Sequence, residues 1–325
     1  MSRHQRPRCS ISIDLDAVAC YYKIHGLGTA PPELEHVVLE RALPRAAALF
    51  HARGLHVTWF VVGRDADADA ALPDRSQRAA NAARLRELHQ HGDELGNHSY
   101  SHPYELARLA PDVIDDEVAN CDRVLRSITR AGIRGFRAPG YDVSPAMLDA
   151  LARRAYRYDS SIFPAPGYYA AKAAVMAALA IARRPSGAVM IDPRSQAAPA
   201  VPYRPAMTAP WRRGQAPLVE LPIAVTPWVR IPAIGTSLLV APEIVRRRVI
   251  AAMAKRDFFN FELHGIDFAD AEKDGIPGEL VARQIDLRVP IADKLARMEA
   301  ILDDLQRTWD IVTLAEVASE IQLAA

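Results

Sequence analysis

The chain has 325 residues, half of them hydrophobic, which is enough apolar material for a sizeable core. Its 40 basic and 39 acidic residues leave a formal net charge of +1, so it lacks the broad positive surface of a nucleic-acid-binding protein. Three cysteines without framework spacing argue against a disulfide-stapled fold and predict reduced thiols. We therefore expect a folded globular protein that does not bind nucleic acid.

Short apolar runs typical of strands alternate with alanine-rich helical stretches. This alternation predicts an α/β fold with parallel strands. The expected strands cover residues 11–15, 57–62, 94–96, 135–137 and 258–263, and the expected helices cover 34–53, 75–91, 111–131, 145–154 and 292–310. Gly54, Gly92 and Gly132 each follow a helix, at a position where glycine readily takes the left-handed cap.

Regular patterning fails between about residues 163 and 232, where prolines recur. We expect a long irregular insertion that covers the core as a lid, because its apolar content suits an ordered covering better than a disordered linker. Its apolar run 173–182 is too short to span a bilayer, which leaves a buried helix or a helix resting on a membrane surface. No second domain is apparent, so residues 1–325 are expected to form one domain.

The first nine residues are basic and polar and lack the apolar core of a signal peptide. The expected location is therefore the cytoplasm. Tyrosines and paired arginines in the insertion could also offer apolar surface and cations to the inner face of the membrane.

Two histidines, His98 and His102, follow the third expected strand at a spacing of four residues. If their turn is helical, both rings lie on one face and can hold one cation. Pro103 then ends the turn, since proline disfavours helical geometry in the residue before it. The pair alone is a common pattern, so a metal site also needs a carboxylate from elsewhere in the chain.

Asp14 and Asp16 lie at the end of the first expected strand, at a spacing that places both carboxylates on one face. Two negative charges held together are costly without a cation. Asp16, His98 and His102 would give three protein ligands and leave an open position for water.

Three more clusters lie at or near the ends of short extended segments. They are residues 136–141 with Arg137 and Gly140, residues 158–163 with Asp159, and residues 261–265 with His264. One such cluster is unremarkable, because a single polar residue at a strand end is usually structural. Five in this order, from about residue 11 to residue 265, indicate a single site.

The ordered set resembles the polysaccharide deacetylase family, the NodB-homology hydrolases of carbohydrate esterase family 4. The resemblance implies a distorted (β/α) barrel of about seven parallel strands, with the site at their carboxyl ends. It also implies a metal-dependent hydrolase that removes an acetyl or formyl group from the nitrogen of an amino sugar, a glycan or a lipid-linked glycan precursor.

Carried over by position, the resemblance assigns a role to each candidate. The implied metal ligands are Asp16, His98 and His102. Asp14 would be the general base, Arg137 would hold Asp14 in place, and the backbone amide near Gly140 would stabilise the oxyanion. His264 would be the general acid, with Asp159 as its orienting partner. The cofactor would be one divalent metal ion, expected to be zinc, with cobalt, nickel or manganese as alternatives.

Several positions depart from the family pattern. Leu15 separates the two carboxylates, the glycine and aromatic after Pro139 are reversed, Phe163 stands where tryptophan is usual, and Leu263 directly precedes His264. We therefore expect a substrate pocket unlike that of a typical chitin or peptidoglycan deacetylase. Two alternatives stay open: a catalytically silent member of the same fold that binds a glycan or partner protein, and a hydrolase of non-carbohydrate C–N bonds.

Overall fold

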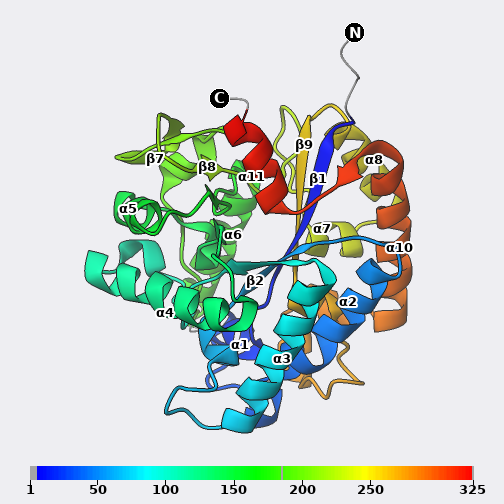
Figure 1. The fold of residues 1–325 in the computed structure, drawn as a ribbon. Coiled ribbons are helices and arrows are strands. Elements are labelled where there is room, and N and C mark those ends of the chain that lie inside the picture. Colours follow the sequence, from blue (N-terminus) through cyan, green and yellow to red (C-terminus); the bar gives the residue numbers. More distant parts are fainter. Residues whose placement is uncertain (1–5, 184–185, 324–325) are drawn as a thin grey trace.

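The protein is described by a computed structural model over residues 6–183 and 186–323. Most of its strands join one main sheet in which neighbouring strands are parallel. Figure 1 shows these strands running through the molecule between the helices. In spatial order they are β9 (Phe258–His264), β1 (Arg8–Asp14), β2 (Thr58–Val61), β3 (Glu94–Asn97), β4 (Gly135–Phe136), β5 (Tyr158–Asp159) and β8 (Val219–Glu220).

β1 pairs along its whole length with β9. On its other edge it pairs with β10 (Asp310–Ile311) near its start and with β2 near its end. All but its first residue are buried, as in a parallel strand that is covered on both faces. The register sets Asp14 opposite His264, so two candidate site residues lie at the same level of the sheet.

The sheet curls until its two edges come together. Just beyond β8, the backbone N–H of Ala224 donates to the carbonyl of Asn260 in β9 at 3.1 Å. The Asn260 side chain in turn donates to the carbonyl of Leu221 at 3.0 Å. The predicted fold class, a distorted (β/α) barrel with about seven parallel strands, is confirmed.

The predicted helices are found with close boundaries. They are α2 (Leu43–His51), which continues a π-helical turn at Val38–Ala42, α3 (Arg75–His91), α4 (Pro111–Thr129), α5 (Pro145–Arg153) and α10 (Ile291–Thr308). Figure 1 places α4 and α5 on one side of the strands and α2 and α10 on the other. In α4 the buried side chains recur at helical spacing, and proline opens the helix at a position where its missing N–H costs nothing.

The structure adds helices that the sequence pattern did not predict. They are α1 (Val18–His25), α7 (Gly235–Val240), α8 (Glu243–Met253), α9 (Gly278–Val281) and α11 (Leu314–Leu323). The first four run for 11 residues or fewer, too short for a clear period against the flanking loops. α11 is amphipathic and packs its buried face near β1 and β8.

The stretch from 163 to 232 is more regular than predicted. It holds α6 (Pro166–Ile181), a hairpin of β6 (Pro205–Ala206) and β7 (Ala209–Arg213), and β8. Because β8 is a strand of the main sheet, the stretch is not solely a lid over the core.

α6 covers most of the apolar run that was predicted as either a buried or an interfacial helix. Tyr169 is the buried residue of α6, whereas Val175 is 59% exposed and Ile181 is 85% exposed. The buried-helix prediction is therefore wrong, and the interfacial one stays a prediction. Within the described ranges, no helix combines the length and the apolar character needed to cross a bilayer.

Candidate active site

The candidate residues gather where the parallel strands end. Asp14 closes β1, His98 directly follows β3, Arg137 directly follows β4, and His264 closes β9. Carboxyl ends of parallel strands share one edge of the sheet, and this edge is where α/β barrels carry their sites. The fold thus joins residues that lie up to 250 positions apart.

Asp16, His98 and His102 converge as a possible metal-binding set. Asp16 Oδ1 lies 3.1 Å from Nε2 of His98 and 3.1 Å from Nε2 of His102. All three side chains are buried, and His102 Nε2 has no well-oriented hydrogen-bond partner among the described residues. A buried ring nitrogen left in this way, beside a second imidazole and a carboxylate, fits a tetrahedral divalent cation with one open position.

The two histidines meet although their turn is not helical, unlike the geometry considered above. Ser99 and His102 have φ angles of 64° and 58°, in the left-handed region. Side chains hold this loop: Asn97 Oδ1 accepts from the N–H of Ser99 at 2.8 Å, and Ser99 Oγ accepts from the N–H of His102 at 3.1 Å. Such local hydrogen bonds compete with helix formation, which explains the difference.

Each imidazole is oriented through its other ring nitrogen. His98 Nδ1 lies 2.8 Å from the carbonyl oxygen of Arg137, which favours a proton on Nδ1 and a free lone pair on Nε2. His102 Nδ1 lies 3.4 Å from Sγ of Cys20. Burial by itself would raise the pKa of the Asp16 carboxyl, but the two adjacent histidines hold it well below its usual range.

Asp14 is held by a fully buried arginine. Arg137 Nη1 donates to Asp14 Oδ1 at 2.6 Å, and its other nitrogens donate to Ser12 and Ser160. The guanidinium also lies over the ring of Phe60, 4.2 Å from its centroid. Burial raises the pKa of the Asp14 carboxyl, although Arg137 opposes this rise. The second oxygen of Asp14 lies 3.9 Å from His98 Nε2 and so faces the cation-binding set.

His264 pairs with a carboxylate of its own strand. Glu262 Oε1 lies 2.9 Å from His264 Nδ1, and it also accepts from the hydroxyl of Tyr141 at 3.0 Å. Burial would lower the pKa of His264, but the Glu262 carboxylate raises it well above its usual range. Alternation along β9 puts Glu262 and His264 on the site face and turns Leu263 into the core.

The predicted pairing of Asp159 with His264 is not found. Asp159 lies opposite Glu220 in the pairing of β5 with β8, and the two carboxyls share a hydrogen bond. Asp159 also accepts from the hydroxyl of Ser161 at 2.5 Å. Burial raises the pKa of Asp159 to about 6, and burial together with the Asp159 charge raises the pKa of Glu220 well above its usual range.

Gly140 follows the strand-end arginine in a tight turn. Its φ is 69°, and a Cβ there would lie 2.9 Å from the Tyr104 ring, so glycine is required on two grounds. The N–H of Tyr141 donates to the carbonyl of Ala138 at 3.2 Å. Because the Tyr141 amide already donates this hydrogen bond, the Gly140 amide remains the proposed oxyanion donor.

Three contributors were missed at the level of sequence. They are Glu262, Tyr141 and Cys20. Two-residue alternation from His264 would have pointed to Glu262, because residues two apart in a strand share a face. No comparable signal marks Cys20, which is brought to His102 by the helix that follows β1.

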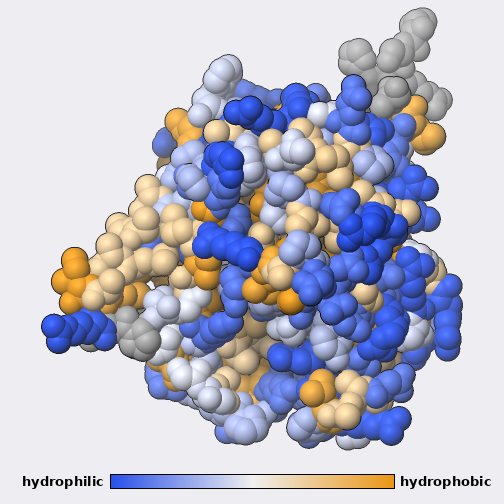
Figure 2. Space-filling model, turned by 90° about the vertical axis from the view of Figure 1, so that its left-hand side faces the viewer, coloured by the Kyte–Doolittle hydropathy of each residue, from blue (hydrophilic) through white to orange (hydrophobic). Residues whose placement is uncertain are grey.

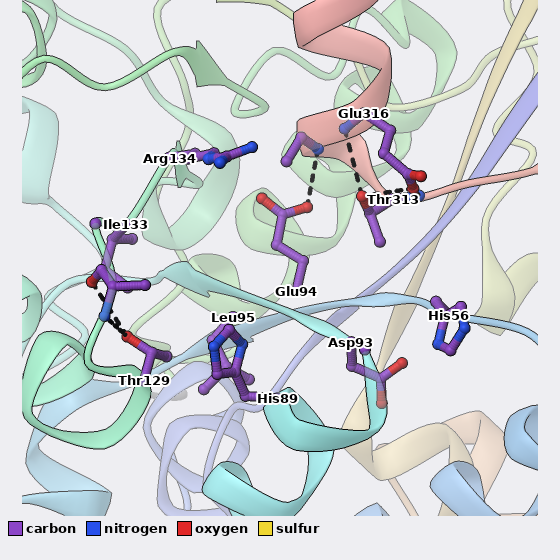
Figure 3. Close-up of a pocket in the computed structure, with 14 residues that line it drawn as sticks. His56, His89, Asp93, Glu94, Leu95, Thr129, Ile133, Arg134, Thr313 and Glu316 are labelled. Carbon is purple, nitrogen blue, oxygen red and sulfur yellow. Dashed lines mark hydrogen bonds between the residues drawn. The ribbon is translucent and has the colours of Figure 1, made fainter.

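A cavity lies at the opposite, amino-terminal ends of the strands (Figure 3). Its acidic side chain Glu94 already accepts hydrogen bonds from the backbone of Ala315 and from the side chains of Thr58 and Tyr158, at 2.8–2.9 Å. These contacts tie α11 to the sheet. Polar groups at this end of a barrel serve stability, and we assign no chemistry to the cavity.

Part of the chain that forms this site is similar to a known protein family. Residues 35–158 match the family model described as polysaccharide deacetylase. The resemblance to that family is confirmed. The matched part spans β2 to β4, ends at the first residue of β5, and includes both histidines and Arg137.

A solved structure shares the fold at low sequence identity, and others show weaker similarity. A protein described as a polysaccharide deacetylase from Mycobacterium smegmatis is 16% identical, with a TM-score of 0.57 over 100% of this chain and 93% of its own. An acetyl xylan esterase of family 4 from Clostridium thermocellum, in complex with a cobalt ion, is 15% identical over 96% and 90%, with a TM-score of 0.44. A family 4 pseudoenzyme from Bacillus anthracis is 11% identical over 97% and 66%, with a TM-score of 0.44. No curated protein matches the sequence.

Proposed function

We propose that the protein is a metal-dependent hydrolase that removes an acetyl or formyl group from the nitrogen of an amino sugar, a glycan or a lipid-linked glycan precursor. The observation that carries the proposal is the convergence of three metal-ligand side chains with a buried base and an acid. A binding protein of the same fold has no need of that combination. The family match supports a deacetylase of this kind.

The proposed cofactor is one divalent ion, with zinc as the first candidate, held by Asp16, His98 and His102. When bound, such an ion supplies Lewis-acid chemistry that polarises the acyl carbonyl and lowers the pKa of water. The buried Nε2 atoms of both histidines and one oxygen of Asp16 are the atoms available to it.

The protein's own side chains divide the proton transfers. Asp14 accepts a proton from the attacking water through the oxygen that faces His98, while Arg137 fixes its other oxygen. His264 gives a proton to the leaving nitrogen, so it must be protonated beforehand. Glu262 favours that state because it holds a negative charge 2.9 Å from Nδ1. The amide of Gly140 completes the set as the oxyanion donor.

The test is a mass-spectrometric screen for loss of acetyl or formyl from amino sugars, nucleotide sugars and lipid-linked sugars, on protein of measured metal content. We expect turnover of at least one N-acylated sugar, abolished by a chelator and restored by zinc or another divalent ion. Turnover that survives complete metal removal would refute the metal-dependent mechanism. Metal binding with no turnover of any amide would favour the catalytically silent alternative.

A further inference from the structure

A cavity of about 420 Å³ adjoins the candidate catalytic residues. Tyr141 and His264 are part of its lining, together with Tyr21 and Tyr104. Whatever reaches the acid His264 from this side must therefore contact the other lining residues, and their chemistry selects it.

One wall of the cavity is the inner face of α6. Its lining residues are Tyr168, Ala171, Lys172, Val175, Met176 and Leu179. They recur at spacings of three and four, so they form a single stripe along the helix. At 1.5 Å per residue the stripe extends over roughly 16 Å. Apart from Lys172, the stripe has the length and the apolar character of a core-facing helix surface, but it faces a cavity.

The other walls offer little to a sugar ring. Ile24, Ile234 and Ile266 contribute apolar surface. Some of the polar side chains in these walls are already engaged, since His25 and Gln284 lie 3.0 Å apart and Thr236 donates to Asp267 at 3.1 Å, whereas the Tyr21 hydroxyl has no partner among the described residues. Polar ligands are held by several convergent donors and acceptors, whereas a hydrocarbon needs none. The lining thus suits an apolar occupant.

The exposed side of α6 also supports an apolar occupant. Monomeric proteins rarely expose large contiguous apolar surfaces unless these surfaces bind something. Along 16 residues α6 buries Tyr169 alone, and its last residue, Ile181, is almost fully exposed. Figure 2 shows a largely hydrophobic ridge that projects at the left of the view, on the side of α6.

We propose that this cavity binds the hydrocarbon chain of an amphiphilic substrate, laid along the inner stripe of α6 with the acylated nitrogen beside His264. The chain belongs either to the acyl group that is removed or to a lipid carried by the sugar, and both present the same alkyl surface to α6. That the amphiphile is a substrate rests on the proposed function. That the cavity binds an alkyl chain does not.

Binding is tested with hexyl, octyl and decyl glucoside, which contain no amide bond, by titration calorimetry below their micelle concentrations. Burying one methylene group contributes about 0.8 kcal/mol, which is about fourfold in affinity. We expect the affinity to rise at least about tenfold from the hexyl to the decyl compound, with or without added zinc. Equal affinities along the series would overturn the proposal.

Two neighbouring substitutions on α6 provide a matched pair. Met176 is half-buried and lines the cavity, whereas Ala177 is exposed and does not. Met176→Glu is expected to lower decyl glucoside affinity at least about tenfold, because it places a charge against the chain, and Ala177→Glu to change it less than about twofold. Equal losses in both variants, or no loss in either, would overturn the proposal. The proposal would also be overturned if the wild type were a dimer that binds no alkyl glucoside and if Met176→Glu made it monomeric, since a second copy of the chain would then cover the stripe.

The activity arm compares N-acetylglucosamine, its octyl glycoside and N-octanoylglucosamine. Faster hydrolysis of the octyl glycoside assigns the chain to the sugar side, and faster hydrolysis of the N-octanoyl compound assigns it to the acyl side. Hydrolysis of all three with the same kcat/KM would overturn the alkyl site and retain the proposed hydrolase. Chain-length-dependent binding without hydrolysis would retain the alkyl site and count against the hydrolase.

Discussion

Replacing Glu262 with glutamine separates the role of this carboxylate from that of Asp159. Glutamine keeps the shape and can still accept the hydrogen bond from Tyr141, but it removes the negative charge 2.9 Å from His264 Nδ1. A hydrogen bond to a charged group contributes roughly 1.5–3 kcal/mol. If that energy supports the protonated, correctly oriented imidazole in the transition state, kcat/KM should fall about ten- to a hundredfold.

The pH profile gives a second readout with a definite sign. Glu262 raises the pKa of His264 well above its usual range, so in the wild type the acid stays protonated as the pH rises past neutrality. In Glu262→Gln this pKa falls, and activity should be lost at a lower pH than in the wild type. The acidic limb, which reports the base Asp14, should move less because Arg137 remains in place.

Steady-state hydrolysis of the best substrate from the screen, between about pH 5 and 10, measures both effects. Asp159→Asn is the matched control, since it neutralises a buried carboxyl that contacts Glu220 and Ser161 but not His264. The alkaline limb should stay unmoved in that variant. An unmoved limb in Glu262→Gln, or a shift in Asp159→Asn alone, would refute the assignment of Glu262 and restore Asp159 as the partner.

Three further changes test other parts of the site. The wild type should purify with about one divalent metal per chain, and His98→Ala should lose it; elemental analysis showing equal metal in both would contradict the ligand set. Arg137→Leu should lower the free energy of unfolding by about 3–5 kcal/mol, because it leaves the buried Asp14 without its partner; urea denaturation within about 1 kcal/mol of the wild type would contradict this. Glu220→Gln should flatten the loss of stability with rising pH. The raised pKa values of Asp159 and Glu220 make this pair bind more protons in the folded state than in the unfolded state, so its contribution to stability is full below about pH 4 and is lost as the pH rises through about 6 and above. Melting temperatures from pH 5 to 8 that fall equally in both proteins would argue against the pair.

Local signals in the sequence were enough to predict the longer helices and strands. α3 was predicted to the residue because Gly92, with a φ of 111°, ends it as a left-handed cap. β5 and β8, of two residues each, were not predicted as strands, because their pairing depends on neighbours more than on their own sequence. A two-residue strand offers no alternation to detect.

The candidate site likewise combines features that the sequence predicts with features that depend on tertiary packing. The strand-end positions of Asp14, His98, Arg137 and His264 followed from sequence order, because parallel strands bring their carboxyl ends to one edge. The partner of His264 did not follow, since it depends on which side chain the curled sheet turns inward. Asp159 faces Glu220 across β5 and β8, and this left the place beside His264 to Glu262.

The pairing of β1 with β9 also sets the order in which the site can be assembled during synthesis. The proposed metal ligands lie within the first 102 residues, and the strands that precede them pair with one another through β2. His264 emerges from the ribosome 162 residues after His102. At about 5–20 residues per second this delay is on the order of ten seconds. A nascent chain could therefore gather its cation-binding side chains well before its proton donor exists, and β1 would wait through that interval with one edge bare.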